Sequence, residues 1–380
     1  MSNKSKIKIL FFTPFAGYTG SEVSLTNLMK QLDTKKFEIR LYAMSKGELL
    51  DTLPAQITTY YYKGIGGLTK RFINKLTRVF TKNGELEKDV MNIHNEFKPD
   101  IWYLNTLLLD NIASIAQKNR IKYAVHFHEL LKQYNYISAD KMQEMLSGAS
   151  FTVGCCESVC GNLKVFGTSK VLKQYECIET DRIKSDSEKV SSIRNSLSVP
   201  DGHAIIAMSG QRTDIKGFDI FIDVARRLRD KPYFFLWLGG SCNTGYALFL
   251  EKIIAYHKLV NIKIMHPSRE EYYNYLDSCD VFFLSSREDS FPLVMLEAAF
   301  LGKYIVSLNS GGANEFLDEN SGHIINSLNV YEIASELDDV CRKNKNNTVL
   351  ERSKELALKF DAVKQAKLFE VLLQNECPKQ

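Results

Sequence analysis

The chain has 380 residues, of which 44% are hydrophobic and 25% charged, and its formal net charge is +4 at pH 7. This length favours two domains over a single core, and the composition is ordinary for a folded globular protein. So mild a charge does not indicate a nucleic-acid-binding protein. Residues 1–8 lack a signal-peptide core, and no run approaches the roughly 20 apolar residues of a membrane-spanning helix, so we expect a cytoplasmic protein.

The eight cysteines are irregularly spaced, which argues against a disulfide framework in a chain of this size. Cys155, Cys156 and Cys160 cluster, but no Cys-x-x-Cys pair and no suitably spaced histidine accompanies them. We therefore expect reduced, mostly buried thiols rather than a zinc site.

Residues 7–13 form a dense apolar run that is typical of a buried parallel strand. A loop of small residues follows at 17–22, and helical periodicity begins at Val23. A strand, a glycine loop and a helix in this order can hold a phosphate on free backbone N–H groups, although an ordinary strand-to-helix turn has the same pattern. The Gly-x-x-Gly spacing lacks the third glycine of the dinucleotide fingerprint, which disfavours a nicotinamide enzyme.

Residues 68–82 are predicted to form a basic amphipathic helix. Their apolar side chains fall on one helical face, and five lysines and arginines with no acid among them occupy the other. Such a helix can lie on an anionic membrane surface, and it can equally pack its apolar face on its own domain. The pattern leaves both options open.

The apolar run at 123–127 is predicted to be a strand that ends at His128-Glu129. A side chain at the carboxyl end of a strand in an open α/β sheet faces the crevice where ligands bind. Single histidines are more often structural than catalytic, so the pattern alone does not decide between these roles for His128. The same holds for His126, which is the second candidate.

The polar, charge-rich segment 178–200 is predicted to connect two domains, and a new strand begins at 204. The loop after this strand carries Arg212 and Lys216 just before a helix that starts near Phe218. Two cations at the mouth of a helix suit a diphosphate, although Lys216 can also be a solvated residue at a helix start. Further strands at 234–238, 262–265 and 281–284 alternate with helical segments, which predicts a parallel, doubly wound sheet.

The segment 285–315 combines two carboxylates with a helix start. Asp289 lies in a turn before a helix that is predicted to run from Leu293 and to stop at Gly302, and Glu297 lies within this helix. Around Pro292, several backbone N–H groups have no intrahelical partner and can meet sugar or phosphate oxygens. Asp289 can then accept sugar hydroxyls, and Glu297 the two hydroxyls of a ribose. Spacing alone also fits a capping aspartate and a solvated glutamate.

This segment resembles the donor-sugar motif of the retaining glycosyltransferases of family four, which have the GT-B fold. The matching residues are Asp289-Ser290-Phe291-Pro292-Leu293, Glu297-Ala298-Ala299, Gly302 and Gly311-Gly312-Ala313-Asn314-Glu315. The family usually has glutamate at the first acidic position, whereas this chain has Asp289 preceded by Glu288. The resemblance therefore leaves open which of the two acids acts on the sugar.

Other parts of the chain are similar to the same family more weakly. Thr19-Gly20-Ser21 matches its N-terminal glycine loop, His128-Glu129 its histidine near the donor sugar, and Lys216-Gly217 its diphosphate-binding Lys-Gly pair. Gln211 occupies the position where the family most often has arginine, and Arg212 follows one residue later.

The resemblance implies two Rossmann-like, doubly wound domains that face each other across a cleft. The expected boundaries are an acceptor domain at 1–185, a nucleotide-sugar-binding domain at 186–358, and a C-terminal helix at 359–380 that crosses back to the first domain. The implied catalytic residues are His128, Asp289 and Lys216. The implied donor-binding residues are Gly20, Ser21, Gly210, Arg212, Lys216, Ser290, Phe291, Pro292, Leu293, Val294 and Glu297.

The implied reaction is transfer of a sugar from a nucleoside-diphosphate sugar to an acceptor hydroxyl, with retention of the anomeric configuration and without a metal or other cofactor. The acceptor is expected to be a glycan or a lipid-linked molecule in bacterial-type polysaccharide assembly, at the inner face of a membrane. No nucleic acid partner is expected. Two alternatives stay open: a nucleotide-sugar epimerase or hydrolase of the same fold, and a donor-binding partner subunit without catalytic activity.

Overall fold

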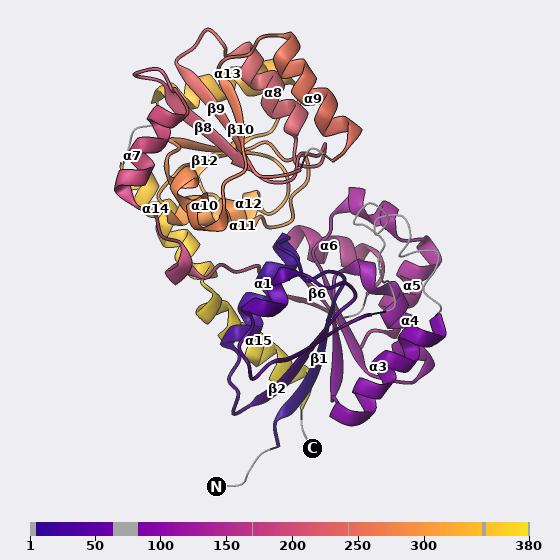
Figure 1. Cartoon of the computed structure of the whole chain (residues 1–380). Coiled ribbons are helices and arrows are strands. Elements are labelled where there is room, and N and C mark those ends of the chain that lie inside the picture. Colours follow the sequence, from indigo (N-terminus) through magenta and orange to yellow (C-terminus); the bar gives the residue numbers. More distant parts are fainter. Residues whose placement is uncertain (1–4, 64–82, 169, 242, 344–346, 379–380) are drawn as a thin grey trace. The chain divides into compact units, whose positions relative to one another are not determined.

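The computed structural model describes residues 5–63, 83–168, 170–241, 243–343 and 347–378. These residues form two compact units, which are coloured along the chain in Figure 1. Unit 1 comprises Met1–Cys177 together with Ala362–Gln380, and unit 2 comprises Ile178–Asp361. The predicted amphipathic helix at 68–82 lies outside the described residues.

Unit 1 is built on a seven-stranded parallel sheet with the strand order β3-β2-β1-β4-β5-β6-β7. Its strands are β1 (Ile7–Thr13), β2 (Phe37–Ala43), β3 (Thr58–Tyr61), β4 (Ile101–Asn105), β5 (Tyr123–Phe127), β6 (Phe151–Gly154) and β7 (Val171–Lys173). The helices are α1 (Gly20–Gln31), α3 (Asn83–Phe97), α4 (Asp110–Lys118), α5 (Ala139–Gly148), α6 (Glu157–Val165) and α15 (Ala362–Glu376). Helices α1 and α15 cover one face of the sheet, and α3 to α5 cover the other (Figure 1).

Unit 2 repeats this architecture with six parallel strands in the order β10-β9-β8-β11-β12-β13. Its strands are β8 (Ala204–Ser209), β9 (Tyr233–Leu238), β10 (Ile262–Met265), β11 (Val281–Leu284), β12 (Tyr304–Leu308) and β13 (Gly322–Ile325). Its helices are α7 (Ser187–Ser196), α8 (Phe218–Arg227), α9 (Gly245–Tyr256), α10 (Arg269–Asp277), α11 (Leu293–Phe300), α12 (Ala313–Phe316), α13 (Val330–Lys343) and α14 (Asn347–Ala357). The predicted doubly wound α/β architecture is confirmed for both units.

Each sheet reverses its strand order at one point: between β1 and β4 in unit 1, and between β8 and β11 in unit 2. At such a point the loops after the two neighbouring strands diverge to opposite faces and leave a crevice at the carboxyl ends of the strands, where ligands of this fold class bind. Ligand-binding residues are therefore expected in the loops that follow β1 and β4, and in those that follow β8 and β11.

The chain passes between the units at two adjacent places. Ile178 and Asp361 form a parallel β-bridge within unit 2, and the Thr180 hydroxyl donates to Asp361 Oδ2 at 2.6 Å. Unit 2 thus begins at residue 178 and ends at residue 361. The boundaries expected from the sequence lay after residue 185 and after residue 358. The last helix, α15, lies in unit 1, where Phe369 packs 5.3 Å from the ring of Tyr103.

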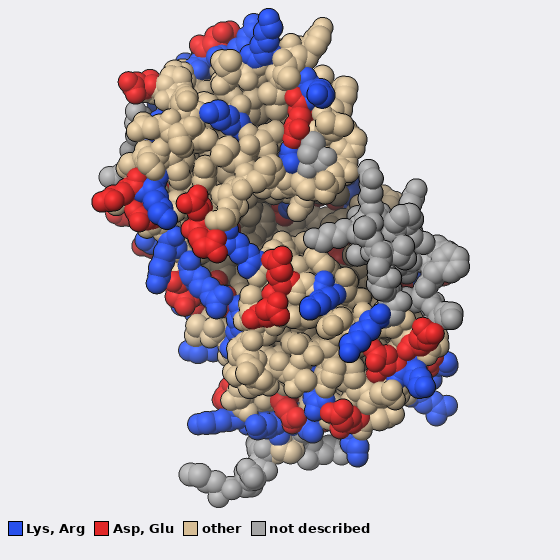
Figure 2. Space-filling view, viewed as in Figure 1, with Lys and Arg blue, Asp and Glu red and all other residues tan. Residues whose placement is uncertain are grey.

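The seven cysteines within the described residues are not joined in disulfides, and five of them are buried. Burial raises the pKa of Cys160 to about 11, so this thiol stays protonated at neutral pH. Among the described residues, no helix is both long and apolar enough to cross a bilayer. Figure 2 shows basic and acidic side chains interspersed over the visible face of each unit, so no broad area of one charge lies there.

Candidate functional site

The loops after β8 and β11 meet at the reversal point of unit 2. Lys216 lies at the end of the first loop, and Gly217, with φ +67°, is the N-cap of α8. A Cβ at Gly217 would lie 1.9 Å from the carbonyl oxygen of Ser285, the first residue after β11. Only glycine fits this close approach, because a side chain would both clash and strain the backbone. The Lys216-Gly217 pair predicted from sequence therefore brings the lysine against the β11 loop.

Lys216 and Asp289 form an ion pair at this meeting point. The Nζ atom lies 2.6 Å from Asp289 Oδ2, and the Ser286 hydroxyl donates to the same oxygen at 3.0 Å. Asp289 is 8% exposed, so its charge is largely removed from water and depends on these partners. Of the two adjacent acids, Asp289 is the one whose carboxylate meets the lysine.

The Gly-Gly turn after β12 fixes the backbone of Asp289. Its N–H donates to Ser310 O at 2.8 Å, and Gly312 N–H donates to its carbonyl at 3.1 Å. A Cβ at Gly312 would lie 1.8 Å from Ser290 O, so this approach also requires glycine. The predicted motif residues at 289–290 and 311–312, which are about 20 positions apart, are thus brought side by side.

The helix start between these residues is as predicted. Pro292 is the N-cap of α11, and Gly302 follows the helix with φ +70°. Phe291 is buried with its ring 4.9 Å from that of Phe360, and Leu293 is buried as well. Their side chains therefore serve the core, and any contact of 290–294 with a ligand falls to the backbone and to Ser290 and Val294, which are partly exposed.

Glu297 is held by two tyrosines of α10 that the sequence interpretation did not identify. Tyr273 donates to Oε1 at 3.1 Å, and the Tyr272 hydroxyl lies 3.4 Å from Oε2. Burial raises the pKa of Glu297 to about 7, and the two tyrosine hydrogen bonds limit the rise. Within the described residues, no lysine or arginine pairs with Glu297. A carboxylate without such a partner, in the helix that follows Asp289, is suited to accept hydroxyl groups.

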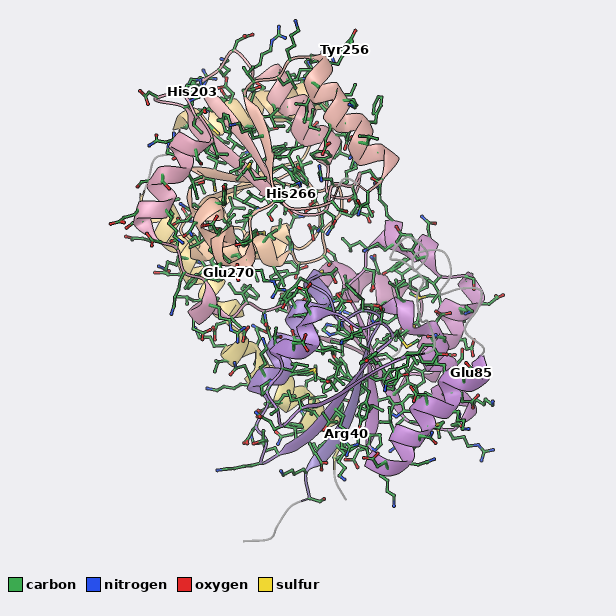
Figure 3. The ribbon with its side chains drawn as sticks, in the orientation of Figure 1. Arg40, Glu85, His203, Tyr256, His266 and Glu270 are labelled. Atoms are coloured by element: carbon green, nitrogen blue, oxygen red, sulfur yellow. The ribbon has the colours of Figure 1, made fainter. Side chains whose placement is uncertain are left out.

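Arg212 has a different environment from Lys216. It is 3% exposed, and its guanidinium bonds to Glu251 of α9 and to Gly240 O at 3.1 Å. Its Nη2 also lies 3.4 Å from His266, which Figure 3 labels just beyond β10. The structure therefore groups Lys216 with Asp289 and places Arg212 with Glu251. Gly210, which was also predicted to bind the donor, opens this loop with φ +159° and accepts a hydrogen bond from Trp237.

In unit 1, His128 follows β5 and is clamped through both ring nitrogens. Nδ1 lies 2.5 Å from Glu176 Oε1, and Nε2 lies 2.8 Å from Asn105 Oδ1 at the end of β4. The Asn105 amide nitrogen donates to Ser21 O at 3.2 Å, which fixes the orientation of the amide. Both ring nitrogens thus face acceptors, and a ring that donates twice is an imidazolium. Asn105 and Glu176 were not identified from the sequence.

The charges around His128 agree with this protonation state. Burial disfavours the charged ring, but Glu176, Glu129 and Glu22 outweigh it, so the pKa of His128 lies above its usual value. His126, the second candidate, is buried beside it with its ring 4.1 Å away, and its Nε2 has no hydrogen-bond partner among the described residues. Burial and the charge of His128 hold the pKa of His126 well below its usual value. His126 is therefore a neutral ring.

The predicted glycine loop of unit 1 leads into the same network. Ser21 donates to Glu22 Oε2 at 2.8 Å, and the Thr19 hydroxyl bonds to the same oxygen. Glu22 is 5% exposed, and burial raises its pKa to about 7. Gly20 begins α1, and a Cβ there would meet nothing within 4 Å, so this position has open space around it.

Among the described residues, one group of potential metal ligands lies close together: His128, Cys155 and Glu176, whose donor atoms are within 4.8 Å of one another. Two of the three are bonded to each other through His128 Nδ1 and Glu176 Oε1. A metal ion would need His128 deprotonated at the nitrogen that now donates to Glu176. The donors present therefore fit an ion pair better than a metal site.

One family model matches part of unit 2. Residues 189–356 match the family model described as glycosyl transferases group 1, and this range contains Lys216, Asp289 and Glu297. A search of curated protein sequences finds no match.

Solved structures resemble the whole chain. HepE from Anabaena, crystallised with UDP-glucose, is 18% identical and superposes with a TM-score of 0.81 over 97% of this chain and 100% of its own. Sucrose-phosphate synthase from Thermosynechococcus elongatus is 12% identical, with a TM-score of 0.80 over 97% and 99% of the two chains. Trehalose-6-phosphate synthase OtsA is 13% identical, with a TM-score of 0.74 over 97% and 99%. The predicted GT-B fold is thereby confirmed.

Proposed function

We propose that this chain is a retaining glycosyltransferase of the family-four type. It would move a sugar from a nucleoside-diphosphate sugar to an acceptor hydroxyl. The bond between the anomeric carbon and the diphosphate oxygen breaks, a bond from that carbon to the acceptor oxygen forms, and a nucleoside diphosphate and a proton are released. The observation that carries the proposal is the Lys216–Asp289 ion pair. It joins the loop after β8 to the loop before α11, the helix that holds Glu297, within the range that matches glycosyl transferases group 1.

Unit 2 supplies the groups that a nucleotide-sugar needs. Lys216 offsets the charge that develops on the leaving diphosphate, which is the largest electrostatic demand of the reaction. Asp289 accepts sugar hydroxyls and, through its ion pair, orients Lys216. Glu297 accepts the two ribose hydroxyls. The solved complex of HepE with UDP-glucose supports a donor of this class.

Unit 1 supplies His128, to which we assign contact with the reacting sugar. Both of its ring nitrogens are bonded in the structure without donor, so a sugar contact through a ring nitrogen requires Asn105 or Glu176 to release it. Among the candidate-site side chains that the structure describes, none has the setting of an activated nucleophile. This supports a front-face mechanism in which the leaving phosphate takes the acceptor proton.

We also propose that no metal or other cofactor takes part and that the acceptor is a lipid-linked glycan at the inner face of a membrane. The sequence holds no Asp-x-Asp motif, which is a common way of holding a divalent ion on a diphosphate. The basic amphipathic pattern of 68–82 supports the membrane part of the proposal. Sedimentation with anionic vesicles at low salt, and its loss at high salt, tests that part, and an absence of sedimentation at low salt would end it.

The first test of the function is a thermal-shift panel of nucleoside-diphosphate sugars, followed by transfer assays with the donor that stabilises the chain most. Nuclear magnetic resonance of the product then reads the anomeric configuration. A product of inverted configuration would refute retention, and failure of every donor to bind would refute the function. Turnover of the donor without an acceptor would favour the epimerase or hydrolase alternative, and binding without any turnover would favour a non-catalytic subunit.

A further inference from the structure

The hydrogen bonds around Glu297 indicate which ligand groups its carboxylate can accept. An ionised carboxylate only accepts hydrogen bonds, and its two oxygens offer about four lone-pair sites. In the structure one site on each oxygen is taken, by Tyr273 on Oε1 and by Tyr272 on Oε2. As far as the described part of the chain is concerned, each oxygen therefore keeps a second acceptor site. Two adjacent acceptors of this kind match two adjacent hydroxyl donors.

The tyrosines are themselves anchored. The Tyr272 hydroxyl lies 2.9 Å from Ser209 Oγ, at the carboxyl end of β8, so it links Glu297 to the start of the loop that carries Lys216. Tyr273 also feels the charges of Glu179 and Arg182, which pair with each other at 3.2 Å. Tyr272, Tyr273 and Glu297 are each partly exposed, so the three residues are not sealed within the core of unit 2. Consecutive residues of one helix thus hold both oxygens of a carboxylate on another.

We propose that Tyr272 and Tyr273 are positioning residues that fix the Glu297 carboxylate for two adjacent hydroxyls, and that they thereby select a ribonucleoside diphosphate over its 2′-deoxy counterpart. This inference rests on the proposed function, because it takes the ligand of Glu297 to be the sugar of a nucleotide. A 2′-deoxyribose offers one hydroxyl instead of two, so it leaves one acceptor of a partly buried carboxylate without a donor. An unfilled polar site of this kind costs more binding energy than a missing apolar contact.

The test compares matched pairs of nucleotides by titration calorimetry: UDP with 2′-deoxy-UDP, and the same pairs for ADP and GDP. The wild-type chain should bind the best ribonucleotide about 10- to 100-fold more tightly than its deoxy partner, which is the effect of one hydrogen bond to a charged group. Tyr273→Phe and Tyr272→Phe should each reduce this ratio by roughly three- to tenfold. The reduction should come from weaker ribonucleotide binding, with deoxynucleotide binding little changed.

The control is Tyr275→Phe, which alters a tyrosine on the same helix that has no hydrogen bond to Glu297 among the described contacts. This variant should keep the wild-type ratio. A merely structural role for Tyr272 and Tyr273 would weaken both members of a pair equally and leave the ratio unchanged, which would overturn the inference while donor binding stands. If the wild-type chain bound none of these nucleotides, the proposed function itself would fall.

Discussion

Lys216 and Asp289 are 73 residues apart in the sequence, yet their charged atoms lie 2.6 Å from each other. The pairing follows from topology, because each residue closes a loop after one of the two strands at the reversal point of unit 2. Without a donor the lysine neutralises the aspartate. Under the proposed function, the same lysine would meet the diphosphate of a bound donor while the aspartate would meet the sugar.

Lys216→Ala should weaken donor binding by about 1–3 kcal/mol, because it removes a charged hydrogen bond to the diphosphate. Titration calorimetry with the preferred nucleoside diphosphate measures the change. Lys252→Ala, which alters an exposed lysine of α9, serves as the matched control and should bind as the wild type does. Wild-type affinity in Lys216→Ala would remove Lys216 from the site.

Asp289→Asn should lower kcat/KM for sugar transfer by roughly 10- to 100-fold, because the sugar loses an ionised acceptor and Lys216 loses its partner. Glu288→Gln changes the neighbouring acid in the same way and should have a small effect. Steady-state transfer assays of the two variants compare them directly. A larger loss in Glu288→Gln would reassign the working acid to Glu288.

Donor binding should depend on pH through Glu297. Its pKa is raised to about 7, so the carboxylate that accepts the ribose hydroxyls is largely ionised above this pH and becomes protonated below it. Affinity for a ribonucleoside diphosphate should therefore fall as the pH drops from about 8 to 6, and in Glu297→Gln this part of the pH dependence should disappear. Calorimetry at several pH values, at constant ionic strength, shows whether the two profiles differ. Identical profiles would exclude Glu297 as the titrating group.

Glu22 should lower the stability of the fold at alkaline pH. Its folded-state pKa of about 7 lies above the ordinary glutamate value of 4.5. The folded state therefore binds more protons between these values, and stability falls as the pH rises through this range. Glu22→Gln should raise the free energy of unfolding at pH 8 by about 1–3 kcal/mol and have little effect at pH 4.5. Urea titrations at both pH values measure this, with the exposed Glu48→Gln as the control. Equal effects at both pH values would contradict the mechanism.

His128 should carry protons on both ring nitrogens at neutral pH, and His126 should be neutral. Nitrogen-15 correlation spectra of histidine-labelled protein distinguish the two states. Glu176→Gln should lower the pKa of His128, because it removes the carboxylate bonded to Nδ1. The pKa of His128 is higher in the folded state than in the unfolded chain. The His128–Glu176 pair therefore stabilises the fold fully at pH values below the ordinary histidine pKa, and this stabilisation is lost as the pH rises through the raised pKa. A neutral His128 ring at pH 7 would show that the clamp is assigned wrongly.

The candidate-site residues that could be predicted from the sequence are those that follow a recognisable strand. Lys216, Asp289 and Glu297 each follow a recognisable strand in a parallel sheet, so chain order was enough to bring the first two to one edge. Asn105 ends β4 in the same way, and the carboxyl-end rule could have identified it. Glu176 follows an edge strand of three residues, which is too short a pattern to recognise.

Other contacts depend on packing between helices that no local pattern encodes. Tyr272 and Tyr273 lie on α10, and only the packing of α10 beside α11 directs their hydroxyls to Glu297. Arg212 is four residues from Lys216, but its side chain is buried against Glu251 of α9, 39 positions further along. Proximity in the sequence therefore did not predict which cation would share the environment of Lys216.

Helix α15 also has a consequence for how the chain is made. Its residues Ala362, Ala366, Phe369 and Leu373 are almost fully buried in the core of unit 1, against strands that begin at Ile7. During synthesis the first 177 residues therefore emerge without one of their own covering helices, and the apolar sheet face beneath it stays uncovered until the ribosome has made all of unit 2. The unit that starts first is the last to be completed.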